Sequence, residues 1–263
     1  MSTKKINVKF ALFALAATFF GVGVTEFISV GVLPAVAKSF NISTSQAGLI
    51  TTIYALGVAI GAPVLTILTA GIQRKKTILG AIVVFILGHL IIGFAPTFGT
   101  VITGRLIAGA AHGLLFALSS TIAAELVGPS KQASAIAFIF SGFTIATAIG
   151  APLGTSVSDF LGCRIPFLAI AVLGFIALIL NIISLKNKKN EQDDKGKLQD
   201  QFKLAVHPHV LLTLLITILG YGGTFATFTY LSPILENITK VPANKISIIL
   251  VIYGVAIAIG NSL

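Results

Sequence analysis

Charged residues are scarce in this sequence, and acidic ones are the scarcest. Only 8 of the 263 residues are Asp or Glu, against 18 Lys and Arg, while 56% of the chain is hydrophobic. So little charge cannot cover the surface of a water-soluble globular domain. The composition is that of a polytopic membrane protein.

Cysteine is almost absent as well. The single Cys163 excludes an internal disulfide and fits no metal-ligand spacing, so we interpret it as a small apolar packing residue. The sequence also lacks an HExxH motif, a Cys/His set and paired carboxylates. We therefore expect neither an enzyme nor a metal site.

What the sequence has instead is a series of long apolar segments. Each is close to the ~20 residues that a helix needs to cross the hydrocarbon core. The segments are residues 10–33, 46–70, 77–95, 98–123, 132–157, 163–185, 210–235 and 244–263, the last being most of a span. The alternating pattern of a membrane β-barrel is absent. The predicted fold class is an all-α, polytopic membrane helical bundle.

The basic residues lie mainly in alternate connections between these spans. Most of them fall within residues 4–9, 74–76, 131 and 186–203, whereas the opposite connections hold only Lys38, Arg164, Lys240 and Lys245. The positive-inside rule then predicts a cell-membrane protein with a cytoplasmic N-terminus. The net charge of +10 follows from this topology and favours contact with anionic lipid headgroups over nucleic acid.

Part of the sequence is repeated at one constant offset, without a gap. The aligned pairs are Gly21 and Gly220, Gly23 and Gly222, Thr25 and Thr224, Pro34 and Pro233, Tyr54 and Tyr253, and Gly61 and Gly260. We interpret this as a duplicated structural unit. It predicts a six-helix bundle over residues 1–185, a cytoplasmic linker over 186–209 and an incomplete second bundle over 210–263. The chain is thus expected to be C-terminally truncated.

Two charges fall inside predicted spans, Glu26 in the first and Arg105 in the fourth. Each lies about 10 Å below the outer boundary at 1.5 Å per residue, so the two are level. They could form a structural ion pair. Alternatively they form a coupling device, because Arg105 favours the ionised carboxylate whereas loss of water favours the protonated one.

Other residues of the fourth and fifth spans point to close helix packing. His112 lies on the same helical face as Arg105 and is either a proton relay or substrate ligand, or a packed neutral histidine. His89 has no recognisable companion, so we interpret it as structural. A small-residue surface that permits close helix contact, with a role in gating, is predicted at these positions: Gly109, Gly113, Gly142, Gly150, Pro152 and Gly154.

Taken together, these residues resemble the major facilitator superfamily, in its drug/proton antiporter branch. The resemblance covers essentially the whole chain. It rests on these motifs: Thr25-Glu26-Phe27 with Gly31 to Pro34, Gly104-Arg105 to Gly109 with His112-Gly113, Gly142 to Gly154, and Tyr230-Leu-Ser-Pro233 with Gly260-Asn261, the last two similar to arabinose-inducible-type sugar and drug exporters. One departure is that residues 65–71 carry no acid before the basic residues 74–76, which counts against a charge-relay role for that loop.

The resemblance implies proton-coupled efflux of a small molecule, such as a drug or sugar, by alternating access. The implied partners are substrate, protons and membrane lipid; the proton gradient is the energy source, no cofactor is implied, and a monomer is expected. Glu26 would be the proton-coupling site and Arg105 its electrostatic partner. The residues expected to line the substrate cavity are Tyr54, His112, Phe116 and Phe225. The alternative is a truncated, non-transporting remnant of such an exporter.

Overall fold

The computed structural model describes residues 7–186 and 207–260, which form helices and no β-strand. The α-helices are α1 (Val8–Phe40), α2 (Thr44–Ala47), α3 (Leu49–Thr69), α4 (Arg74–Gly93), α5 (Phe98–Glu125), α6 (Gln132–Leu161), α7 (Ile165–Ser184), α9 (Pro208–Thr229), α10 (Leu231–Asn237) and α11 (Ala243–Gly260). A short 3₁₀ turn, Pro129–Lys131, precedes α6.

Hydropathy predicts these spans well. Seven helical segments of the described chain are long and apolar enough to cross a membrane, and α11 contains a shorter apolar stretch, Lys245–Ile257. The all-α membrane fold is therefore confirmed. The predicted span 210–235 differs, because the chain turns at Tyr230 and continues as α10. Pro233 has no N–H to donate to the carbonyl of Thr229, which weakens the helix at this turn.

The helix ends follow local capping rules. The Asn7 side chain accepts from the backbone N–H of Phe10 at 3.2 Å and so begins α1. Ser43 and Gln46 form a reciprocal capping box at α2. Asn41, with a φ of 52°, ends α1 in the left-handed region, which Asn tolerates well.

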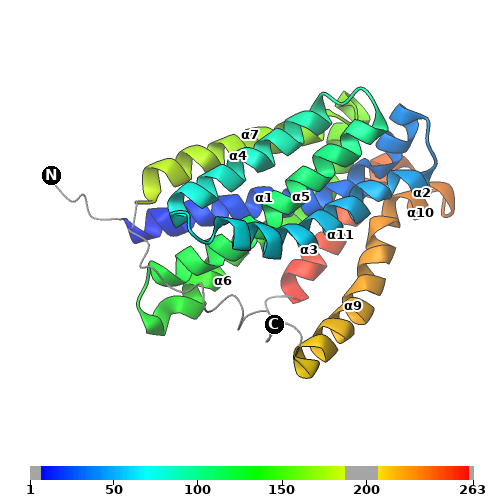
Figure 1. Cartoon of the computed structure of the whole chain (residues 1–263). Coiled ribbons are helices and arrows are strands. Elements are labelled where there is room, and N and C mark those ends of the chain that lie inside the picture. The colour runs from blue at the N-terminus through cyan, green and yellow to red at the C-terminus, as the bar shows by residue number, and fades with distance from the viewer. Residues whose placement is uncertain (1–6, 187–206, 261–263) are drawn as a thin grey trace.

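The helix α1 runs through the middle of the bundle, with α4 and α7 on one side of it and α6 on the other (Figure 1). It packs most extensively on α6 and also contacts α7, while α3 packs on α5 and α5 on α4. Asn181 of α7 is fully buried and donates to Thr18 of α1 at 2.9 Å. These contacts leave α1 buried along most of its length.

The helices after the linker join the bundle at a second apolar cluster. It consists of Phe27, Val30, Ala151, Phe228, Ile246 and Leu250. The helix α11 packs on α6, whereas α9 runs away from the bundle and buries only Phe228 and Thr229 (Figure 1). Most of the predicted linker, residues 187–206, lies outside the described residues, and the division into two bundles stays a prediction.

Candidate functional site

Glu26 lines a cavity at the junction of four helices. The cavity has a volume of about 190 Å³. Its walls come from α1, α3, α5 and α9: Glu26, Thr51, Tyr54, Ala55, Val58, Ala59, His112 and Phe225. Half of these side chains are apolar and the other half bring converging polar groups, a combination that suits a small-molecule site. Four of the residues predicted from sequence therefore meet in one place.

Arg105 is fully buried beside the turn of α1 that carries Glu26. Its Nε–H donates to the carbonyl of Ile50 at 2.8 Å and its Nη2 donates to Oγ of Ser29 at 2.7 Å. Its Nη1 donates to the carbonyl of Thr25 at 3.4 Å. The guanidinium is thus held by neutral oxygens of α1 and α3.

The predicted Glu26–Arg105 relationship is consequently not a direct ion pair. Among the described residues the one ion pair is between Arg74 and Glu125, far from this site in the sequence. The two charges still interact through space. The interpretation as a structural ion pair is therefore wrong for this conformation, because no Lys or Arg side chain of the described residues lies within ion-pair distance of Glu26.

Tyr54 connects Arg105 to His112. The guanidinium carbon of Arg105 lies 4.0 Å from the centre of the Tyr54 ring, which is a cation–π contact. The Tyr54 hydroxyl and Nδ1 of His112 are 2.7 Å apart, which is hydrogen-bond distance. His112, for which either a functional or a packed role was expected, is both hydrogen-bonded and part of the cavity wall.

The two predicted phenylalanines have different surroundings. Phe225 of α9 lies in the cavity wall and contacts Phe27, with ring centres 6.3 Å apart. Phe116 is not among the residues of the wall. It stacks on Phe19 at 4.5 Å and contacts the His112 ring at 5.6 Å. Phe116 thus supports a cavity residue from behind.

His89 has a companion that the sequence did not reveal. Its Nε2 lies 3.2 Å from Oγ1 of Thr25, and its Nδ1 lies 2.8 Å from the carbonyl of Phe85. The expectation that His89 has no companion was wrong, whereas its interpretation as a structural residue agrees with its full burial and with its contact between α4 and the residue next to Glu26. Thr25, Ser29 and the Ile50 carbonyl were missed too. The four-residue spacing of Thr25 and Ser29, one helical turn on the face that meets Arg105, was the available signal.

The predicted small residues lie at two close helix contacts. A Cβ atom added to Gly154 would lie 2.7 Å from the Ile28 carbonyl, and one added to Gly150 would lie 2.9 Å from Cβ of Phe27, so α6 meets α1 there. In α5, a Cβ on Gly113 would lie 2.6 Å from the carbonyl of Val58 in α3, and Gly109 faces the same helix. Gly142 meets the Ala16 backbone, and Pro152 is buried within α6. Close packing is confirmed, whereas a role in gating stays a prediction.

Comparison with known proteins decides the family. The family model described as Major Facilitator Superfamily matches residues 15–263. The chain belongs to the major facilitator superfamily. It is 44% identical over 99% of its length to the uncharacterized MFS-type transporter YtbD of Bacillus subtilis. It is 36% identical over 98% of its length to the inner membrane transport protein YdhP of Escherichia coli K12, and 34% identical over 99% to the uncharacterized MFS-type transporter YfhI of Bacillus subtilis.

The relatives that share this family are transporters of the major facilitator superfamily. These are non-enzymatic membrane transporters that bind small-molecule substrates within the membrane and typically need no cofactor. Within the described residues, no group of three or more His, Cys, Asp and Glu side chains could hold a metal ion. The chain spans 65% of the length of YtbD and 66% of that of YdhP.

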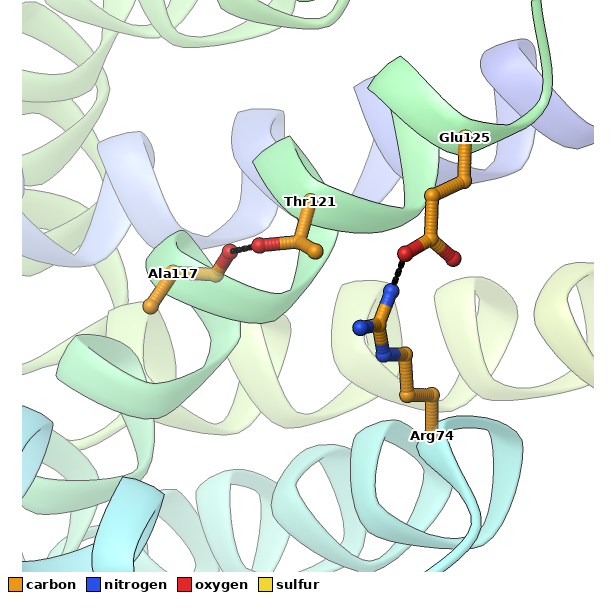
Figure 2. A network of polar contacts seen from close by, with 4 residues as sticks. All are labelled: Arg74, Ala117, Thr121 and Glu125. Atoms are coloured by element: carbon orange, nitrogen blue, oxygen red, sulfur yellow. Dashed lines mark hydrogen bonds and ion pairs between the residues drawn. The ribbon is translucent and has the colours of Figure 1, made fainter. Parts of the chain in front are cut away.

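The basic residues at the start of α4 contact other helices of this major facilitator bundle. Arg74 forms an ion pair with Glu125 at the end of α5, as Figure 2 shows, and both side chains are exposed. In the same helix, Thr121 donates to the carbonyl of Ala117 at 2.9 Å. Residues 65–71 carry no acid, so the acidic partner of this basic cluster comes from another helix. Lys75 donates to the carbonyls of Ile182, at 2.9 Å, and Leu185, and so satisfies the end of α7.

Proposed function

We propose that the chain acts in proton-coupled efflux, exchanging protons for a small molecule by alternating access, with Glu26 as the proton-carrying group. The observation that carries this proposal is the position of Glu26. It is an acid in the middle of an apolar helix, it faces a cavity, and it has no ion-pair partner among the described residues. Ionisable side chains at membrane depth are costly and mark ion or substrate pathways.

Arg105 gives Glu26 a means of responding to conformation. Its positive charge favours the ionised carboxylate, while the apolar surroundings favour the protonated one. The guanidinium is bound to both α1 and α3. A change in the relative position of these helices would alter its distance from Glu26. Proton binding and helix movement are then coupled, as antiport requires.

The cavity also supports an exchange of substrate for protons over a flow of protons alone. Phe225 comes from α9, beyond the linker, and occupies the repeat position of Glu26 in the second unit. A substrate in the cavity would touch the protonatable helix on one side and this ring on the other. Movement of α9 against α1 would therefore expose substrate and Glu26 together to one face of the membrane. We place the protein in the cell membrane with its N-terminus in the cytoplasm.

The test is transport in everted membrane vesicles whose lumen is acidified. Uptake of ethidium, L-arabinose and uracil into the vesicles is followed for the unaltered chain and for Glu26→Gln. Gln keeps the size and polarity of Glu but cannot exchange a proton, so gradient-driven uptake should fall by about tenfold or more. The control is Glu236→Gln, because Glu236 is exposed in α10 and should leave uptake unchanged.

Two results would contradict the proposal. One is undiminished gradient-driven uptake by the Glu26→Gln protein. The other is no uptake of any probe by the unaltered chain, which would favour the alternative of a membrane protein that inserts without transporting.

A further inference from the structure

Thr51 carries a hydrogen-bonding group that the protein itself does not use. Most buried threonines here donate to the carbonyl four residues earlier in the same helix, as Thr18 and Thr25 do. For Thr51 that carbonyl belongs to Ala47 of α2, across the helix boundary at Gly48. The Thr51 Oγ1 atom is buried without a hydrogen-bond partner among the described residues, although the residue lines the cavity. A rotation about χ1 would turn the hydroxyl to the cavity without breaking any hydrogen bond.

His112 offers a second unused group in the same wall. Its Nδ1 is engaged by the Tyr54 hydroxyl at 2.7 Å, and no described residue hydrogen-bonds its Nε2. If Tyr54 donates to Nδ1, the neutral ring carries its proton on Nε2 and offers a donor. If Nδ1 donates to Tyr54, Nε2 becomes an acceptor. The pair can therefore match either kind of group on a ligand.

The rest of the cavity sets the size and the charge of that ligand. A volume of about 190 Å³ is one-ring size, since an engineered apolar cavity of about 150 Å³ accepts benzene. Phe225 supplies an aromatic surface, and Ala55, Val58 and Ala59 supply an apolar one. Arg105 is fully buried behind the Tyr54 ring and has its own acceptors, so it offers nothing to a ligand.

We propose that this cavity binds a neutral, single-ring molecule bearing hydroxyl or amide groups, and that Thr51 and His112 select it by hydrogen bonding. The inference rests on the proposed function and names its substrate class. A buried hydroxyl that lacks a partner costs free energy until a ligand satisfies it, and Nε2 of His112 offers the same ligand a second hydrogen bond. A quaternary ammonium ion has no group that could do so. Glu26 accepts from the same ligand when it is ionised and donates to it when it is protonated.

The experiment measures ligand binding to the purified chain in detergent, as the rise of the thermal unfolding midpoint with probe concentration. The probes are L-arabinose and uracil, which distinguish a sugar from a pyrimidine as the source of this chemistry, and trimethylphenylammonium, a one-ring cation. The variants are Thr51→Val, which removes only the hydroxyl, Thr51→Ser, which keeps it, and the control Thr52→Val on the exposed neighbour.

At least one neutral probe should bind the unaltered chain. Thr51→Val should weaken that binding by about tenfold, which is about 1.4 kcal/mol. Thr51→Ser should restore it and Thr52→Val should not change it. Without probe, Thr51→Val should unfold no earlier than the unaltered chain, because the hydroxyl has no partner to lose. His112→Phe gives a second route, because it should weaken binding of the same neutral probe.

Equal affinity in Thr51→Val and the unaltered chain would overturn the inference. Binding of trimethylphenylammonium alone, or of no probe, would overturn it as well. Binding of a neutral probe without transport would instead contradict the proposed function and leave this assignment of the cavity standing.

Discussion

Arg105 is a buried charge whose partners are all neutral. Burying a guanidinium is unfavourable unless its hydrogen-bonding capacity is satisfied. Three oxygens in three directions do this here, on Ile50, Thr25 and Ser29. A planar fork fits such an arrangement, whereas the compact ammonium group of lysine does not. The residue therefore has to be arginine, and not merely positive.

The first residue-scale prediction follows from this geometry. Arg105→Lys keeps the charge but loses the three hydrogen bonds of the guanidinium, so it should lower the free energy of unfolding by about 2 kcal/mol, given about 0.6 kcal/mol for each bond in a membrane protein. Thermal or denaturant unfolding in detergent measures this. Arg74→Lys is the matched control, because its ion pair with Glu125 is exposed and exposed pairs contribute at most about 1 kcal/mol. Equal loss in both variants would refute the role given to Arg105.

Part of the site was predictable residue by residue. Glu26 and Arg105 stand out because charges are rare in apolar helices, and Tyr54, His112 and Phe225 were expected in the cavity that they do line. His89 and Thr51 were not, because their importance depends on what lies opposite them on another helix. A hydroxyl without a partner is a property of the packed structure. The sequence alone shows that Thr51 has a hydroxyl, and only the fold shows that no acceptor of the described residues faces this hydroxyl.

Helix pairing determines the properties at the scale of elements. The contact between α1 and α6 depends on glycines of α6, because a Cβ atom added to Gly142 or Gly154 would overlap the backbone of α1. Overpacking at a helix contact typically lowers the free energy of unfolding by about 1–3 kcal/mol. Replacing Gly by Ala within a helix raises it by up to about 1 kcal/mol, which offsets part of that loss. The balance differs from one glycine to the next.

This difference gives the element-scale prediction. Gly154→Ala should lower the unfolding midpoint, because its Cβ would lie 2.7 Å from the Ile28 carbonyl. Gly21→Ala should leave the midpoint unchanged or raise it, because an added Cβ meets nothing within 4 Å. The same thermal unfolding assay measures both variants. A stabilised Gly154→Ala protein would show that close approach of α1 and α6 is not required for stability.

At the scale of the whole molecule, hydropathy was enough to find the spans but not to pair them. Length and apolar content locate most spans to within a few residues, since the bilayer sets both. The extension of α1 to Phe40 and the turn at Tyr230 escaped prediction. Both depend on local backbone hydrogen bonds near the membrane boundary, which a hydropathy window does not sense. The pairings of α1 with α6 and of α3 with α5 required the structure.

The prediction at the scale of the whole molecule concerns which side of the membrane each connection faces. In a chain with Cys163→Ser, a single cysteine at the exposed position of Lys240 should react with a membrane-impermeant maleimide in intact cells. One placed at exposed Lys76 should react only after the cells are opened, because the positive-inside rule puts the basic connection in the cytoplasm. Mass spectrometry of the labelled protein measures both. The opposite pattern of labelling would reverse the assigned orientation.

The contact of Lys75 with the end of α7 also has a mechanical consequence. Leu185, one of its acceptors, stands directly before the segment that leads to α9. Helix ends normally fray, and a fraying end absorbs tension by unwinding. Here unwinding would first have to break the bonds from Lys75 to Ile182 and Leu185. Tension applied at Leu185 would therefore be transmitted to α4 as well as to α7, so a displacement there would reach two helices of the bundle at once.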